Sequence, residues 1–208
     1  MEGMISRLKG RVVLTVAALL VTLAASAQVI EYENNGKKYQ TLTHNGLTVI
    51  VTHLPNHVAG FGLLQVSISN GSDIYWTVQP EGFVYDYAEQ SVRAISAGQV
   101  VDVMLSKGSH ADVVKLVTSY ENNLYGIPNM RTTNGYEQRR QSAFSEGMPS
   151  KLKAAATASA IALAQTRLAP GQSTDGSVFI PLNKEMKGLA GGHVVFRSGT
   201  ETFEFNPD

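Results

Sequence analysis

Residues 45–52 read Asn-Gly-Leu-Thr-Val-Ile-Val-Thr and contain the two signals that decide the fold, a turn and an alternating strand. The Asn45-Gly46 pair suits a two-residue hairpin turn, because these residue types accept the positive φ angles of such turns. After the turn, Leu, Val and Val occupy every second position, so they face one side of a strand. The sequence therefore predicts an antiparallel hairpin with strands at about 38–43 and 47–53.

The same period of two recurs on both sides of this hairpin. Further strands are predicted at about 64–69, 74–78, 83–87, 166–168, 178–180, 194–197 and 202–205. Strands that repeat every 8–12 residues or so, with polar turns between them, are typical of a sandwich or barrel. Alternation places Trp76 with Ile74 and Val78 on the core face and leaves Tyr75 on the surface.

Between residues 96 and 165 the pattern changes to that of helices. They are predicted at about 97–106, 110–124, 135–146 and 151–164. Ser96, Ser109 and Asn134 each stand three residues before a Gln, Asp or Glu, which is the spacing of an N-terminal cap. The last segment is so rich in alanine that helix propensity alone favours it. The expected fold class is mainly β with an α insertion (α+β): an immunoglobulin-like antiparallel β-sandwich with about four helices inserted between strands.

Residues 1–27 have the pattern of a cleavable secretory signal peptide. A basic end is followed by an apolar run and by Ala25-Ser26-Ala27, a small-x-small cleavage site. A membrane span needs about 20 apolar residues with anchoring flanks, and this run is shorter, although a retained signal anchor is the alternative. We therefore expect an exported protein, periplasmic or extracellular. Residues 28–208 are expected to form a single domain with a helical insertion at about 97–165.

The composition argues against several classes of function. The full chain has 17 basic and 17 acidic residues. Without residues 1–27 it loses three basic side chains and one acidic side chain, so 14 basic and 16 acidic residues leave a net charge of −2. So weak a charge gives no electrostatic case for binding nucleic acid or, after cleavage, an anionic membrane. The absence of cysteine excludes disulfides, thiol catalysis and thiolate metal sites. In an exported protein this composition favours a bacterial cell envelope.

Five short motifs in the predicted strands resemble a known family. They are Val-x-Ile-x-Asn at 66–70, Tyr-Trp-x-Val-x-Pro-Glu-x-Phe at 75–83, Leu-x-Pro-Gly at 168–171, Gly-x-Val-Phe at 176–179 and Glu-x-Phe-x-Phe at 201–205. Their order resembles the exported bacterial immunoglobulin-like sandwiches called telokin-like, which are domains of unknown function. The resemblance implies the fold and no catalytic residue. The helical block departs from the family pattern and is similar to uncharacterised exported proteins of soil bacteria.

The residues indicate no catalytic, cofactor or metal site. His53 and His57 are four apart, but Pro55 lies between them in a strand end or loop, so the helical spacing of metal ligands does not apply. No Gly-x-Ser-x-Gly elbow marks a nucleophile. A pair of glycosidase carboxylates is left open, because sequence alone does not show which carboxylates meet.

Functions of different classes stay open. The first is a non-enzymatic binding or scaffold protein of the bacterial cell envelope, in which the sandwich displays the helical insertion and the insertion contacts another envelope protein. Its candidate partner-binding residues are Tyr75, Tyr120, Tyr136, Arg139 and Arg140. The second is a carbohydrate-binding module or hydrolase that uses a groove between the sandwich and the helical insertion. The helices could also serve stability alone by capping an open sheet edge.

Overall fold

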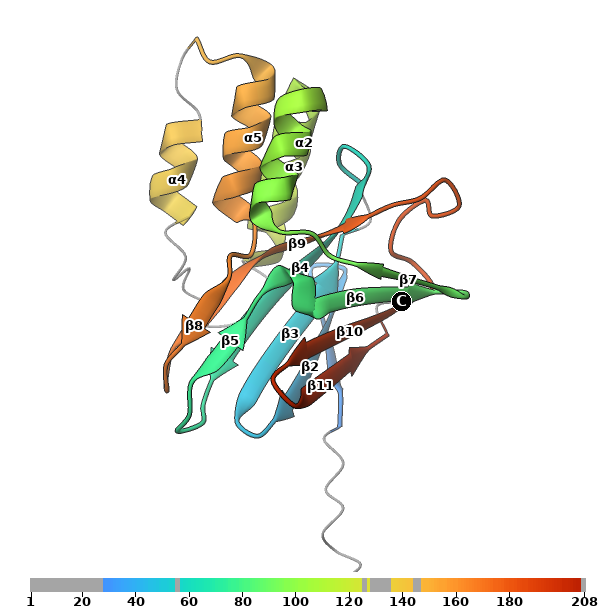
Figure 1. The fold of residues 1–208 in the computed structure, drawn as a ribbon, viewed down its shortest axis with the longest axis vertical. Helices are drawn as coiled ribbons and strands as arrows, with labels where there is room; N and C mark the ends of the chain where they lie inside the picture. The colour runs from blue at the N-terminus through green and yellow to red at the C-terminus, as the bar shows by residue number, and fades with distance from the viewer. Residues whose placement is uncertain (1–27, 55–56, 125–126, 128–135, 144–146, 207–208) are drawn as a thin grey trace, which may run out of the picture.

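The computed structural model describes residues 28–54, 57–124, 127, 136–143 and 147–206. The predicted signal peptide and the predicted helix cap at Asn134 lie outside these residues. The described chain is mainly β, with several antiparallel sheets and four helices, as the sequence predicts at this level (Figure 1).

Within the described residues, two larger sheets and one short strand pair make up the β part. The five-stranded sheet has the order β1-β2-β3-β4-β9, with β1 Ile30–Asn34, β2 Lys37–His44, β3 Leu47–His53, β4 Phe61–Asn70 and β9 Ser173–Pro181. The four-stranded sheet has the order β11-β10-β6-β7, with β6 Phe83–Tyr87, β7 Gln90–Arg93, β10 His193–Ser198 and β11 Glu201–Phe205. β5 (Trp76–Val78) pairs with β8 (Thr166–Leu168), and a short 3₁₀ turn, η2 (Pro80–Gly82), precedes β6.

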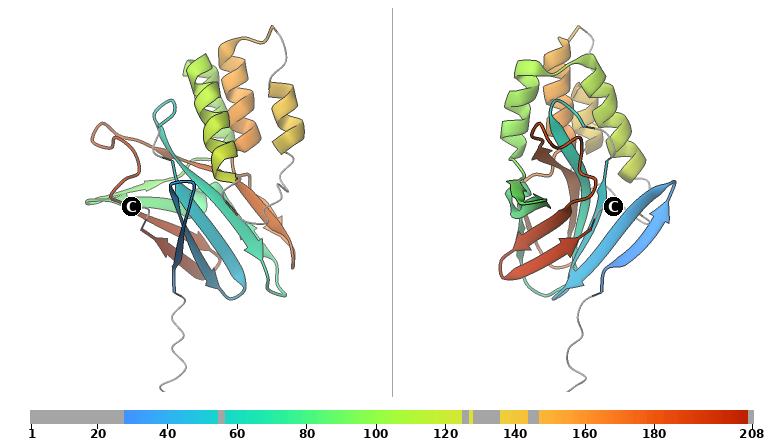
Figure 2. Two further views of the ribbon diagram at one scale, coloured as in Figure 1. Left: turned by 180° about the vertical axis from the view of Figure 1, so that it is seen from behind. Right: turned by 90° about the vertical axis from the view of Figure 1, so that its right-hand side faces the viewer.

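The two larger sheets share one hydrophobic core. The side view in Figure 2 shows them as separate layers. Leu64, Val66 and Ile68 of β4 contribute to this core from the larger sheet. From the smaller sheet, Phe83 and Phe196 stack with ring centroids 4.2 Å apart. Alternate residues of each strand thus meet between the layers, which is the arrangement that a period of two requires.

The hairpin predicted at Asn45-Gly46 is confirmed. β2 and β3 pair antiparallel, and His44 lies opposite Leu47 across the turn. Asn45 and Gly46 have φ angles of 45° and 78°, the left-handed values that favour asparagine and glycine at these two positions.

The four described helices lie between β7 and β8, as the sequence predicts. They are α2 (Ala97–Lys107), α3 (His110–Leu124), α4 (Tyr136–Ala143) and α5 (Ser150–Ile161). Two of the predicted caps are confirmed. The Ser96 hydroxyl accepts from the backbone N–H of Gln99, and the Gln99 side chain accepts from the Ser96 N–H. Ser109 and Asp112 exchange the same pair of hydrogen bonds at the start of α3.

Helix α5 is the central helix of the block and contacts α2, α3 and α4. Its buried residues are mostly alanine, among them Ala154 and Ala158, so the neighbouring backbones can approach closely. A Cβ added at Gly108, just after α2, would lie 2.7 Å from the Cβ of Ala154. The helices bury their apolar faces together with Phe61, Leu63 and Phe179 of the larger sheet, which gives the chain a second core.

Both ends of the helical block are bonded to the outer edge of β9. Before α2, the backbone N–H of Ile95 donates to the carbonyl of Phe179 at 3.1 Å. After α5, the N–H of Leu163 donates to the carbonyl of Ser177 at 2.9 Å. An unpaired strand edge is a template for aggregation, so these two contacts protect the edge of the larger sheet next to the helices.

The structure also corrects several predictions of detail. Ile74 is 53% exposed and does not share the core face with Trp76 and Val78, because the alternating strand begins only at Trp76. Strands β1 and β7 were not predicted, and β9 begins five residues before the predicted 178–180. The last hairpin turns at Gly199-Thr200, and its strands reach one residue nearer to the turn than the predicted 194–197 and 202–205, because Ser198 pairs with Glu201.

Candidate functional site

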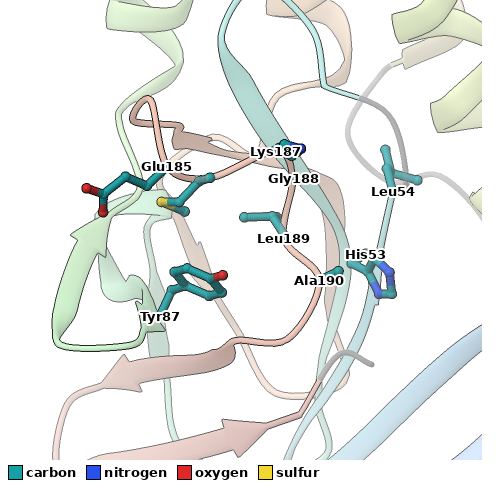
Figure 3. A pocket seen from close by; sticks show the side chains of 9 residues that line it. His53, Leu54, Tyr87, Glu185, Lys187, Gly188, Leu189 and Ala190 are labelled. Atoms are coloured by element: carbon teal, nitrogen blue, oxygen red, sulfur yellow. The ribbon is translucent and has the colours of Figure 1, made fainter.

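A pocket of about 430 Å³ lies at one end of the two sheets (Figure 3). Its lining comes from the end of β3, the end of β6 and the loop between β9 and β10, and includes no residue of the helices. The lining residues are His53, Leu54, Tyr87, Glu185, Met186, Lys187, Gly188, Leu189 and Ala190. The pocket is therefore a different place from the predicted groove between the sandwich and the helical insertion.

The loop of residues 182–192, here called the pocket loop, is anchored to the sheet where it leaves β9. The N–H of Leu182 donates to the carbonyl of Gly60 at 2.9 Å. Leu189 is 1% exposed and lies directly over Gly62. A Cβ at Gly62 would come within 2.6 Å of the Leu189 side chain, so a residue without a side chain is needed there.

The pocket loop is also fixed within itself and at its far end. The side-chain oxygen of Asn183 accepts from the N–H of Glu185 at 2.9 Å and from that of Met186 at 3.0 Å. The Tyr85 hydroxyl donates to the carbonyl of Ala190 at 3.3 Å. Tyr85 fills the space where a Cβ of Gly192 would be, with its Cζ and hydroxyl oxygen 2.2 Å from that position. These contacts fix the pocket loop along its length, so the wall of the pocket is already formed in the folded chain.

The chemistry of the lining is apolar at the base and charged at the rim. Leu54, Met186 and Leu189 are buried, while His53 and Tyr87 are half-buried. The hydroxyl end of Tyr87 points toward Leu189 in Figure 3. Lys187 and Glu185 are exposed. The Glu185 carboxylate points away from the other lining side chains and accepts from Gln90 Nε2 at 3.1 Å.

Three of the predicted partner-binding residues meet elsewhere, around Glu121 of α3. Tyr136 donates to the Glu121 carboxylate at 2.9 Å, and Arg140 Nε lies 2.9 Å from the same oxygen. The rings of Tyr120 and Tyr136 are 4.5 Å apart, and both side chains are buried. Within the folded chain these two tyrosines are thus core residues and offer no surface to a partner.

The other two predicted residues lie apart from each other. Arg139 donates to the carbonyl of Ser159 in α5 at 3.0 Å, so it holds α4 against α5. Tyr75 is 57% exposed, in the loop between β4 and β5 at the end of the sheets away from the helices (Figure 1). The predicted surface position of Tyr75 is confirmed. The five residues do not form one surface.

The loop that carries Tyr75, residues 71–75, is held by hydrogen bonds and is here called the Tyr75 loop. Asn70 is buried and donates to the carbonyl of Ile74 at 2.7 Å. Its oxygen accepts from the N–H of Ser72 at 3.0 Å and from the Ser72 hydroxyl at 2.7 Å. The Trp76 indole donates to that hydroxyl at 2.9 Å. The guanidinium carbon of Arg167 lies 4.4 Å from the centre of the Tyr75 ring.

The chain matches nothing in three comparisons with known proteins. No protein-family model, curated protein or solved structure matches it.

Two further observations concern the part of the chain that the structure describes. It contains no group of three His, Cys, Asp or Glu side chains placed to hold a metal ion. Nor is any helix there long and apolar enough to cross a membrane. His53 lies at the pocket, whereas His57 is exposed.

The residues of the pocket were not found by sequence reasoning. The sequence pattern shows His53 only as one of two histidines four residues apart, and Tyr87 only as the end of a predicted strand. The one signal in the sequence is the length of the glycine-rich segment between β9 and β10, because long loops in compact domains are often functional.

Proposed function

We propose that this protein is an exported, non-enzymatic binding protein of the bacterial cell envelope, and that it contacts another envelope protein through the Tyr75 loop. The signal-peptide pattern of residues 1–27 supports export to the periplasm or the extracellular space. The observation that carries the proposal is the exposure of two large apolar side chains, Ile74 at 53% and Tyr75 at 57%, on a loop fixed by hydrogen bonds.

Preorganisation makes this loop suited to binding. A flexible loop loses conformational entropy when it docks, and this cost is smaller for a loop that is already ordered. Asn70 orders the backbone at Ser72 and at Ile74 through the bonds described above. Tyrosine and arginine are enriched among the residues that dominate binding energy, and here Arg167 lies over the Tyr75 ring.

The proposal also includes the type of β-sandwich. We infer an immunoglobulin-like sandwich of the telokin-like kind, with a helical insertion. Two antiparallel sheets that share one core support this assignment. The buried positions of Trp76 and Phe83, which belong to the motif at 75–83, support it as well. Such a fold gives a rigid support for a binding loop.

Site-specific photo-crosslinking tests the proposed surface. A photoreactive phenylalanine analogue would replace Tyr75, Leu152 or Asp102 in the full chain, expressed in a Gram-negative host envelope. Leu152 is 45% exposed on α5 and tests the helices as an alternative surface, while Asp102 is an exposed control position on α2. We expect a discrete adduct from position 75 alone. An adduct only from position 152, or the same adducts from all three positions, would overturn the Tyr75 surface.

Export is tested separately. We expect the mature protein to begin at Gln28, because cleavage follows Ala27 in the predicted pattern. N-terminal sequencing of protein recovered from the periplasm and from the medium gives the result. A chain that keeps residues 1–27 and stays in the membrane fraction would contradict the proposal.

A further inference from the structure

We propose that the pocket beside the pocket loop binds a small amphipathic anion: an apolar body that carries one carboxylate or sulfonate group. The site differs from the Tyr75 loop in place and in chemistry. Its volume of about 430 Å³ lies within the range of roughly 300–1,000 Å³ that is usual for small-molecule pockets. The inference is independent of the proposed partner surface.

The apolar part of the ligand follows from the base of the pocket. Leu54, Met186 and Leu189 are 3%, 6% and 1% exposed. Tyr87 adds a half-buried ring whose hydroxyl end points toward Leu189 (Figure 3). A hydrocarbon or aromatic body placed there removes its own apolar surface and part of the Tyr87 ring from water, which is favourable by about 25 cal/mol per Å².

The anionic part follows from the charges at the rim. Lys187 and His53 line the pocket and can both carry positive charge. The one lining carboxylate, that of Glu185, points away and accepts a hydrogen bond from Gln90. An anionic group at the rim therefore meets an ammonium group without facing a carboxylate across the pocket. A cationic ligand would meet the ammonium group of Lys187 as a like charge.

The pocket is ready to bind without a large ordering cost. Its loop is anchored at Leu182, fixed internally by Asn183 and closed by Tyr85 on Ala190. The glycines at 62 and 192 admit Leu189 and Tyr85 against the backbone. A site whose wall is already formed loses little conformational entropy on binding.

Two matched fluorescent probes test the inference. They are 8-anilinonaphthalene-1-sulfonate and N-phenyl-1-naphthylamine, which share the same ring system and differ by the sulfonate. We expect the sulfonate probe to bind the folded chain roughly two- to fivefold more tightly, since one partly exposed charge pair contributes a factor of up to about five. Methyl resonances of Leu54, Met186 and Leu189 should shift on binding. Equal affinity of the two probes, or shifts at Ile74 in their place, would overturn the proposal.

Variants of the pocket loop give the matched control. Lys187→Ala should weaken the sulfonate probe about three- to fivefold and leave the neutral probe unchanged. Lys184→Ala, at an exposed position of the same loop outside the lining, should change neither. Gly188→Leu adds an apolar side chain at a lining position where a Cβ meets no atom within 4 Å, so it should weaken the binding of both probes.

Circular dichroism must show each variant folded, because the sulfonate probe also binds partly folded chains. Equal effects of Lys187→Ala and Lys184→Ala would contradict the assigned role of Lys187.

Discussion

The hydroxyl of Tyr120 in α3 donates a hydrogen bond to the carboxyl group of Asp175 in β9, and both side chains are buried. The two residues are 55 positions apart in the chain. This bond joins the helical block to the sheet through their shared interior, beyond the two backbone contacts at the ends of the block. The helices are thus part of the folded body, because their removal would expose the buried Phe61, Leu63 and Phe179 of the larger sheet to water.

Tyr120→Phe should lower the free energy of unfolding by about 1–3 kcal/mol, because it removes a hydrogen-bond donor from a buried carboxyl group while keeping the ring. Urea unfolding followed by circular dichroism measures the change. Tyr75→Phe is the matched control, since the Tyr75 side chain is 57% exposed, and should change stability by less than about 0.5 kcal/mol. Equal stability of the Tyr120 variant and the wild type would show that the bond contributes nothing.

Asn70→Ala should disorder the Tyr75 loop and destabilise the chain. The amide of Asn70 bonds the carbonyls of Ile74 and Leu168, and its oxygen accepts twice from Ser72. Loss of these bonds at a position 2% exposed should cost about 2–3 kcal/mol. Asp73→Ala, at an exposed position of the same loop, is the control.

Trp76 is the single tryptophan of the chain, so its fluorescence reports on the Tyr75 loop in the Asn70→Ala variant. Its indole donates to the Ser72 hydroxyl, which Asn70 holds in place. We expect the fluorescence maximum of the folded Asn70 variant to move to longer wavelength as water reaches the indole. An unchanged spectrum in the folded variant would mean that Ser72 keeps its place without Asn70.

Replacing Gly176 and Gly98 by alanine should change the stability of the chain in opposite directions. A Cβ at Gly176 of β9 would lie 2.6 Å from the backbone of Leu163, where the end of the helical block meets the sheet. Gly176→Ala should therefore destabilise the chain by about 1–3 kcal/mol. At Gly98 in α2 the nearest atom would be 3.9 Å away, so Gly98→Ala should gain up to about 1 kcal/mol from helix propensity. Thermal unfolding of the two variants and the wild type measures both changes. A loss of stability in both variants would contradict the expected difference between the two positions.

Local signals in the sequence were enough to predict the helices and most strands. The caps at Ser96 and Ser109 and the turn at Asn45-Gly46 depend on neighbours within three residues, so the sequence itself contains the cause. Strand β9 was predicted too short for the opposite reason. Its buried positions at Asp175 and Ser177 are polar, and only their contacts with α3 and β4 explain why they lie inside.

The candidate sites were harder to predict, because they depend on distant segments. The pocket brings His53 together with Leu189, and no local pattern connects these residues. Tyr120 and Tyr136 were predicted at a partner-binding surface, yet here their hydroxyls satisfy buried or half-buried carboxylates. Ile74 was predicted inside by alternation, although the bonds from Asn70 hold that part of the chain as a loop.

Stability should fall between about pH 10 and pH 12 through Tyr39. Burial, with a smaller contribution from neighbouring Tyr32, raises the pKa of Tyr39 from 10.0 to about 12. The two rings stack with centroids 5.0 Å apart, and burial raises the pKa of Tyr32 as well. In this window the unfolded chain releases a proton that the folded chain keeps, so rising pH favours unfolding. Below pH 10 both states hold the proton, and this contribution to stability is fully present.

Two measurements test this dependence on pH. The absorbance of phenolate should show late ionisation near pH 12 in the folded chain, which Tyr39→Phe diminishes by one tyrosine. In urea this late ionisation should coincide with that of the other tyrosines. The Tyr39 hydroxyl donates to the carbonyl of Asn123 at 3.1 Å, so the variant should also lose about 1 kcal/mol at neutral pH. Urea unfolding at pH 9 and pH 11 should show a smaller loss of stability for Tyr39→Phe than for the wild type. If all the tyrosines of the folded chain ionised together near pH 10, the pKa of Tyr39 would not be raised by folding, and the predicted loss of stability through Tyr39 would be wrong.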